Sequence, residues 1–253
     1  MCARTSSRRG HRFREAGLST GIQGLASLYI TKLDLDAAKK LLERGMELAE
    51  ESGGVMVKAA VLERCGNLSL IEGDLDGAEE SFTQALDLYR EVGFAAGTAW
   101  GLKHLGTLAW KRGDLAQAKE RYHEAVKILK KLGDRAYLCE VQRSLAELLV
   151  DDGRIDEAER FALEARETVG PQDALSQITT TFSLGVVRAA QRRDEEAEAL
   201  FVSALERAET GPFRLIEREA VDRYARFLRE RGRDDEAAPF EDRLASGPLA
   251  AAA

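Results

Sequence analysis

The chain has 253 residues, of which 44% are hydrophobic and 32% are charged, and its formal net charge is −7. An acidic chain is a poor candidate for nucleic acid, which needs many cationic contacts to phosphates, and no apolar run approaches the roughly 18 residues that cross a membrane. The chain has three cysteines, an odd number, and none of them is in C-x-x-C spacing, so we expect neither a disulfide framework nor a zinc site. We expect the protein to work in a reducing, cytoplasmic setting.

The two ends of the chain differ from the part between them. Residues 1–16 are rich in arginine but hold no apolar run, so they do not match a secretory signal peptide. We expect them to form a disordered basic arm. Residues 246–253, which end in a run of alanines, are expected to be a disordered tail. The residues between them, 17–245, carry an internal repeat.

A short motif returns along the chain at a nearly constant step. Gly-Asp-Leu-Asp-Gly-Ala at 73–78 returns as Gly-Asp-Leu-Ala-Gln-Ala at 113–118 and as Gly-Arg-Ile-Asp-Glu-Ala at 153–158, a step of 40 residues. An earlier copy lies at 33–38, and later copies end on Ala197 and Ala237, with a step of 39 before Ala197. Six copies at such a period indicate a repeat architecture.

Small and bulky residues occupy fixed columns of this repeat. Twelve residues before the closing alanine only Gly or Ala occurs: Ala26, Gly66, Gly106, Ala146, Gly185 and Ala225. Seven residues after it stand Gly45, Ala85, Ala125, Ala165 and Ala204, and Leu244 breaks the rule. Four residues after it stand the bulky Leu42, Phe82, Tyr122 and Phe201, from which Ala162 and Glu241 depart. Small residues at fixed places indicate helices that approach each other closely.

Each copy predicts two helices. In the third copy we expect the first helix over Ala95–Arg112, ended by Gly113. Asp114 should cap the second helix, because its carboxylate can accept a free backbone N–H. In the last three copies arginine takes the cap column, so we expect the cap to move and the turns to be looser; the arginines are Arg154, Arg193 and Arg233, and the new caps would be Asp156, Asp194 and Asp234. Pro171 and Pro212 should mark joints between copies.

One helix pair cannot bury its own apolar face, so successive pairs should stack into a continuous core. The sequence therefore predicts an all-α fold, an α-solenoid of six antiparallel helix pairs. The columns resemble the tetratricopeptide repeat (TPR), with the matching residues Leu102, Leu105, Gly106, Ala118, Tyr122 and Ala125 in the third copy and Leu25, Ala26, Tyr29 and Ala38 in the first. The period of 40 and the missing closing proline resemble the longer kinesin-light-chain-type variant.

This resemblance implies a right-handed superhelix whose first helices line a concave face. The family binds peptides or partner proteins there and has no common enzymatic chemistry, so the resemblance implies a scaffold or adaptor. The sequence also looks similar to the C-terminal repeat regions of large bacterial signalling ATPases, including those attached to nucleotide cyclases or transcription regulators. A regulatory or sensor segment of such a protein is the alternative function.

Motifs for catalysis or metal binding are incomplete. Residues 17–21 match G-x-S-x-G, but no strand precedes them, as a nucleophile elbow requires. His123 and Glu124 begin H-E-x-x-H, but the second histidine is missing. No nucleophile, base and orienting group cluster along the chain. We therefore expect neither an enzyme nor a cofactor or metal site.

One stripe of the expected first helices is not used by the core columns. It carries two tryptophans, which are favoured at interface hot spots, and an asparagine, which can both donate to and accept from a peptide backbone. The candidate partner-binding residues are Asn67, Trp100, Lys103, His104, Thr107, Trp110 and Arg143. The alternative is that both tryptophans simply pack between neighbouring helices. The sequence identifies neither the partner nor the oligomeric state.

Overall fold

The computed structural model describes residues 17–18 and 21–246, and over these residues it contains helices and turns but no strand. The expected basic arm, 1–16, lies outside the described residues, as does the tail from 247 onward. The helices are α1 (21–31), α2 (Leu35–Ser52), α3 (Val55–Ile71), α4 (Leu75–Glu91), α5 (Ala95–Lys111), α6 (Leu115–Leu132), α7 (Arg135–Asp151), α8 (Ile155–Thr168), α9 (Ala174–Ala190), α10 (Asp194–Glu209), α11 (Arg214–Glu230) and α12 (Asp234–Ala245). They alternate as the repeat predicts, with odd numbers for the first helix of each pair and even numbers for the second.

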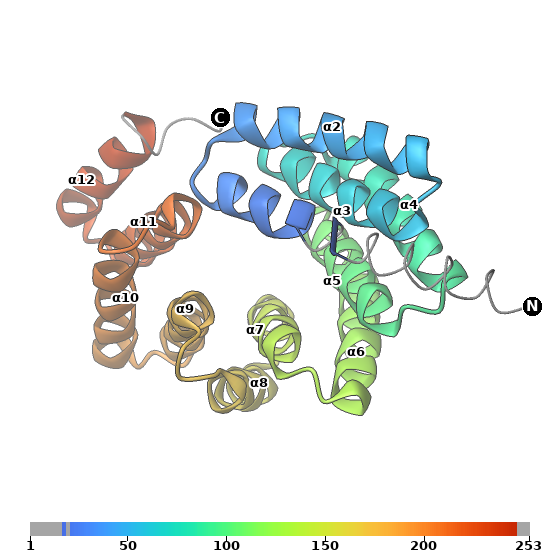
Figure 1. Cartoon of the computed structure of the whole chain (residues 1–253). Helices are drawn as coiled ribbons and strands as arrows, with labels where there is room; N and C mark the ends of the chain where they lie inside the picture. Colours follow the sequence, from blue (N-terminus) through green and yellow to red (C-terminus); the bar gives the residue numbers. More distant parts are fainter. Residues whose placement is uncertain (1–16, 19–20, 247–253) are drawn as a thin grey trace, which may run out of the picture. The chain divides into compact units, whose positions relative to one another are not determined.

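The chain forms two compact units, and the boundary between them falls inside α5. The first unit contains residues up to Gly101 and the second those from Leu102, apart from a short segment at 31–33. In the second unit α7, α9 and α11 form one layer of helices. A second layer, made of α8, α10 and α12, packs against one face of the first (Figure 1). Helices that follow one another in sequence pack on each other, and α7 also contacts α9. The predicted stacking of helix pairs is confirmed.

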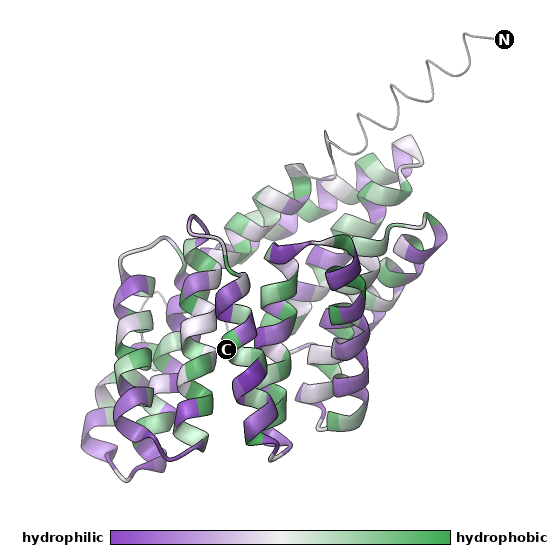
Figure 2. Cartoon of the chain, turned by 90° about the horizontal axis from the view of Figure 1, so that it is seen from below, coloured by the Kyte–Doolittle hydropathy of each residue, from purple (hydrophilic) through white to green (hydrophobic). Residues whose placement is uncertain are grey.

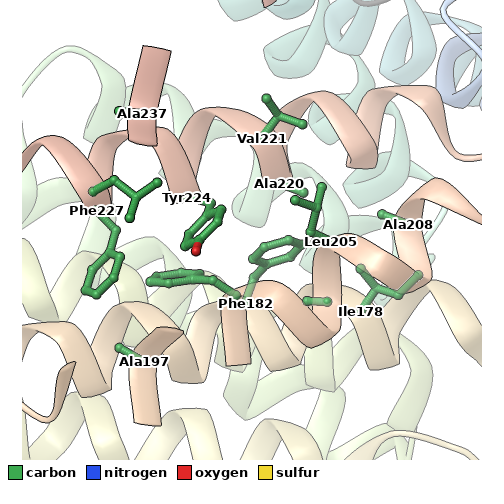
Figure 3. Packing of buried hydrophobic residues seen from close by; sticks show 13 residues of the cluster. Ile178, Phe182, Ala197, Leu205, Ala208, Ala220, Val221, Tyr224, Phe227 and Ala237 are labelled. Atoms are coloured by element: carbon green, nitrogen blue, oxygen red, sulfur yellow. The ribbon is translucent and has the colours of Figure 1, made fainter. Parts of the chain in front are cut away.

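Apolar and polar residues are mixed along the helices, which Figure 2 shows as adjoining green and purple stretches. The buried side of the second unit is dominated by alanines and aromatic rings (Figure 3). Phe201 of α10 lies 5.2 Å from Phe227 of α11 between ring centroids, and Tyr224 lies 5.0 Å from Phe240 of α12. Rings at such distances add about 0.5–1.5 kcal/mol per pair to the burial of their surface.

The small columns of the repeat face the bulky columns. A Cβ atom added to Gly66 would lie 2.6 Å from the ring of Phe82, and one added to Gly106 would lie 2.9 Å from the ring of Tyr122. Carbon atoms in proteins do not approach so closely, so glycine is required where the plug is aromatic. The three glycines of the column face aromatic plugs, while its three alanines belong to the copies with Leu42, Ala162 and Glu241. The volumes of the two columns are therefore matched within each pair.

The turn inside each pair is a left-handed residue followed by a cap. Gly113 has φ 84°, and Asp114 accepts a hydrogen bond from the backbone N–H of Gln117 at 2.9 Å, as expected. Asp34 and Asp74 cap α2 and α4 in the same way. In the first and fifth copies Leu33 and Arg192 take the left-handed position, with φ of 59° and 62°.

The expected shift of the cap in the last three copies is wrong. The arginines stay at the cap position, without a side-chain bond to the backbone. Each instead pairs with the glutamate three residues later, and these pairs are Arg154 with Glu157, Arg193 with Glu196, and Arg233 with Glu236. The backbone turn is also not looser, because Gly153 has φ 74°, like Gly113. The turn geometry is set by the left-handed residue and not by the capping side chain.

The two prolines that were expected at joints lie in the connections between pairs, as predicted. Pro171 lies between α8 and α9, and Pro212 between α10 and α11. Neither begins the following helix: Asp173 caps α9 through the N–H of Ser176, and Phe213 precedes α11. None of the described helices combines the length and the apolar character needed to cross a membrane.

Candidate partner-binding surface

The seven candidate residues all lie on first helices, but they divide between the two units. Asn67 on α3 and Trp100 on α5 belong to the first unit. The remaining candidates belong to the second unit, and these are Lys103, His104, Thr107 and Trp110 on α5 and Arg143 on α7. The geometry of each set is therefore described within its own unit.

Trp100 takes part in an aromatic cluster of the first unit. Its ring meets Phe94 edge-on at 5.6 Å and Tyr89 edge-on at 6.4 Å between centroids. Tyr89 is fully buried and donates its hydroxyl to the Glu63 carboxylate at 2.8 Å. Burial and the Glu63 charge raise the pKa of Tyr89 far above its ordinary value. The inner edge of Trp100 thus packs between helices, while the residue as a whole is half-buried.

Asn67 lies one helical turn after Glu63 on the same stripe of α3, and it is half-buried. Glu63 is 1% exposed and pairs with Arg64 at 2.8 Å as well as with Tyr89. The stripe therefore runs from a buried, fully bonded carboxylate to a half-buried amide. An amide in that position can still donate and accept at its exposed side.

Thr107 and Trp110, the two candidates nearest the end of α5, form hydrogen bonds with neighbouring helices. Thr107 Oγ1 lies 2.9 Å from the hydroxyl of Tyr122 on α6, the bulky plug of that pair. Burial raises the pKa of Tyr122 to about 12, so its hydroxyl stays protonated. Trp110 donates its indole N–H to Asp151 at the end of α7 at 2.7 Å. Lys103 and His104, which are half-buried, lie about one helical turn before Thr107 on α5.

Arg143 lies in a network of charges that joins first helices of the second unit. Its guanidinium pairs with Glu140 at 3.1 Å and with Glu147 at 3.0 Å, both on α7. Glu147 also pairs with Arg223 of α11 at 2.5 Å, and Glu140 accepts a hydrogen bond from Thr179 of α9 at 3.0 Å. We call these five residues, Glu140, Arg143, Glu147, Thr179 and Arg223, the charged network.

The charges of the network compensate one another. Burial alone would raise the pKa of Glu140, but Arg143 and Lys103 outweigh it and hold that pKa below its ordinary value. Burial is likewise outweighed at Glu147, whose pKa is lowered by Arg223 and Arg143. Two carboxylates and two guanidinium groups remain ionised side by side. A carboxylate of a partner would have to compete with Glu140 and Glu147 for Arg143.

Sequence reasoning missed Glu140, Thr179 and Arg223 as members of this surface. The Glu140–Arg143–Glu147 spacing of three and four was a usable signal, because such residues are neighbours on one helix face. Thr179 occupies the same repeat column, one copy after Glu140 and two copies after Trp100. Arg223 reaches α7 past α9, and no column of the repeat predicts that contact.

The buried polar side chains lie on the first helices of the pairs. Every buried Ser, Thr, Gln, Glu or Arg side chain of the described part of the chain lies on a first helix. Burying such groups costs free energy unless they are hydrogen-bonded, and here Ser183 donates to the Arg143 carbonyl at 3.3 Å and Gln142 to Glu164 at 2.7 Å. The described residues hold no group of His, Cys, Asp and Glu side chains suited to a metal ion.

Comparison with known proteins agrees with this architecture. A family described as the MalT-like TPR region matches residues 51–241. The chain belongs to this TPR family. No curated protein matches the chain significantly.

Solved structures of TPR proteins resemble this MalT-like chain in fold. BtubC (BKLC) from P. vanneervenii has a TM-score of 0.58 at 20% identity, covering 84% of this chain and 89% of that one. A putative kinesin light chain of Podospora anserina has a TM-score of 0.51 at 16% identity, covering 76% and 95%. A signal transduction ATPase with numerous domains (STAND) and a TPR sensor from Pyrococcus horikoshii has a TM-score of 0.54 at 16% identity, covering 89% of this chain and 35% of that one. At these identities the likeness shows the fold alone.

Proposed function

We propose that this MalT-like TPR chain is a protein-interaction module that holds a segment of a partner protein on its first helices. The concentration of buried polar groups on the first helices supports this more than any other observation. Replacing buried ion pairs by apolar residues is often neutral or stabilising, so stability alone gives little reason to keep them. A recognition surface does, because polar groups held in place lose little freedom when a partner binds.

The partner surface comprises the half-buried candidates of each unit and the exposed edges of the charged network. In the second unit about a quarter of the Glu140 and Arg223 side chains is exposed, 28% and 29% respectively, at either end of the network. Glu140 presents a carboxylate and Arg223 a guanidinium, so a segment carrying both signs of charge is complementary. The net charge of −7 favours basic residues in the partner.

The proposal is tested by capturing a partner with the full chain and titrating it against single variants. Trp100→Ala and Asn67→Ala probe the first unit, and Lys103→Ala probes the second. Truncating a buried interface Trp commonly costs about 2 kcal/mol or more, roughly 30-fold in affinity. Lys127→Ala on the exposed side of α6 is the matched control for Lys103→Ala, since it removes the same charge from a second helix.

Thermal unfolding of every variant must first show that the fold is kept. Weaker binding by the three first-helix variants with unchanged binding by Lys127→Ala supports the proposal. Unchanged affinity in all three first-helix variants would move the partner surface elsewhere. If Trp100→Ala unfolds, the two other variants still decide the question.

A second candidate function is a sensor segment of a larger signalling protein. The match to the MalT-like TPR region and the likeness to a STAND protein with a TPR sensor, of which this chain covers 35%, favour it. An ATPase domain encoded in the same reading frame would support this function. A cytoplasmic location is a proposal for both functions, supported by the free thiols of Cys65 and Cys139.

A further inference from the structure

One ion pair of the charged network joins first helices that are not neighbours. Glu147 of α7 and Arg223 of α11 lie 2.5 Å apart between Oε2 and Nη2. Helix α9 stands between α7 and α11 and contacts both of them (Figure 1). Each pair of a solenoid ordinarily contacts only its neighbours, so the stacking of the repeat does not by itself account for this bridge.

The side chain of Arg223 reaches α7 across short side chains. In the repeat column of Arg223, α9 and α7 carry Ser183 and Ser144, both of which are buried. Serine is too short to block a long arginine that passes over it, and Glu147 lies about one helical turn after Ser144. The same column holds His104, a candidate partner-binding residue. Arg223 therefore crosses α9 on the stripe of the first helices that the proposed function assigns to a partner.

The bridge leaves one oxygen of the Glu147 carboxylate without a hydrogen bond. Glu147 is 2% exposed, and its Oε1 accepts a hydrogen bond from Arg143 at 3.0 Å. Its Oε2 lies close to Arg223 but accepts no hydrogen bond of normal geometry from any described residue. A buried acceptor without a donor costs free energy, so a cationic donor that approaches Oε2 in better alignment gains more there than Arg223 does.

Arg223 is the more easily released of the two arginines at Glu147. Its side chain is 29% exposed, and Glu147 is its ion-pair partner among the described residues. Arg143 is 15% exposed and is held by two carboxylates, Glu140 and Glu147. When Arg223 leaves, Glu147 remains paired with Arg143, so no buried carboxylate is left without a cation. The released guanidinium is already partly in contact with water.

We propose that Arg223 is an intramolecular occupant of a site for a basic side chain of the partner, with Glu147 as the carboxylate of that site. This rests on the proposed function, because the partner segment has to lie on the first helices. A lysine or arginine of the segment donates to Glu147 Oε2 and displaces Arg223, whose guanidinium then becomes available to an acidic residue of the same segment. The bridge is thus an autoinhibitory contact that favours a segment with both signs of charge.

Fluorescence anisotropy of a labelled oligo-arginine peptide, titrated with the full chain at physiological salt, probes this site directly. Arg223→Met removes the competing guanidinium and keeps an aliphatic side chain. It should tighten binding at least about fivefold, because a site that is mostly occupied from within binds with reduced apparent affinity. An oligo-glutamate peptide of the same length should gain nothing from this change.

Arg226→Met is the matched control on α11. It removes the same charge about one helical turn further along, from an exposed pair with Asp222. Because exposed charges are screened by salt, this change should alter the affinity for oligo-arginine by less than about twofold. Thermal unfolding of each variant shows whether the fold is kept, and Arg223→Gln replaces Arg223→Met if the latter unfolds.

A gain confined to the Arg223 variant, and lost again when Glu147→Gln is added to it, supports the proposal. Equal affinities of the parent and the Arg223 variant contradict it, as does an equal gain in Arg226→Met or a gain that persists with Glu147→Gln. The proposed function is decided separately by the captured partner and Lys103→Ala. A partner that binds the first helices, in a chain where the Arg223 variant changes nothing, would leave that function standing and overturn this inference alone.

Discussion

At the scale of single residues, the helix pairs are specified by matched volumes in two columns. Glycine stands where the facing side chain is aromatic, as at Gly66 with Phe82 and Gly106 with Tyr122, and alanine stands where it is smaller or aliphatic. Interiors packed to this density accept neither a hole nor an extra methyl group without cost.

Gly106→Ala should destabilise the protein by about 1–3 kcal/mol, because the new methyl group overlaps the Tyr122 ring. The larger Gly106→Leu should cost more. In a double-mutant cycle with Tyr122→Leu, the two changes should cost less together than the sum of their separate costs, by about 0.5–3 kcal/mol. Urea denaturation followed by circular dichroism measures all four proteins. Strict additivity would show that the two columns do not face each other.

The charged network makes stability depend on pH. The pKa of Glu147 is lower in the folded protein than its ordinary value, so the unfolded chain binds the proton more readily. The stabilisation is present above the unfolded pKa, about 4.3, and is lost as pH falls through the folded pKa. We expect the free energy of unfolding to decline below about pH 5.

Glu147→Gln should reduce that pH dependence and lower stability at pH 7 by about 3–5 kcal/mol, since Arg143 and Arg223 lose a buried partner. Denaturation midpoints of parent and variant between pH 7 and 3.5 provide the measurement. Parallel pH profiles would exclude Glu147 as a contributor to the dependence.

At the scale of helices and turns, the sequence was sufficient where the rule is local. The helix expected over Ala95–Arg112 is observed as Ala95–Lys111, with Gly113 and Asp114 in their expected roles. The capping rule failed at Arg154, Arg193 and Arg233, because the backbone turn is imposed by the packed helices and persists without a capping side chain. The left-handed Leu33 and Arg192 show the same dominance of packing over local preference.

Asp114→Ala should therefore cost about 1 kcal/mol, the usual worth of a capping carboxylate, while Arg154→Ala should change stability by less than about 0.5 kcal/mol. The Arg154–Glu157 pair is exposed and gives little. Thermal unfolding of the two variants beside the parent tests the contrast. Equal losses would mean that arginine caps as well as aspartate does.

A second test at this scale uses the strained turn. Arg192→Gly should stabilise the protein by about 0.5–1 kcal/mol, because a side chain at positive φ costs about 1–2 kcal/mol and glycine returns part of this as entropy of the unfolded chain. Gly113→Ala at φ 84° is the opposite control and should destabilise. A lower midpoint for Arg192→Gly would show that its side chain contributes more than the strain costs.

At the scale of the whole molecule, the period of the repeat predicts the helices of each pair and how neighbouring pairs stack. It does not predict which side chains of distant pairs come into contact. The period and the columns predicted the helices and their stacking, since each depends on near neighbours. The part of the charged network on α7 follows from its spacing, but the contact of Arg223 with Glu147 could not be predicted, because these residues lie on first helices two pairs apart. Trp100 and Trp110 showed the same limit, since their contacts with Phe94 and Asp151 depend on the rotation of α5.

The central claim is that a partner binds the first helices. Hydrogen–deuterium exchange of the full chain, with and without a captured partner, tests it most directly because it reports on every helix at once. The account predicts slower exchange on binding in the first helices α3, α5, α7, α9 and α11, with the second helices α4, α6, α8, α10 and α12 unchanged. Protection confined to the second helices, with the first helices exchanging as in the free chain, would contradict it.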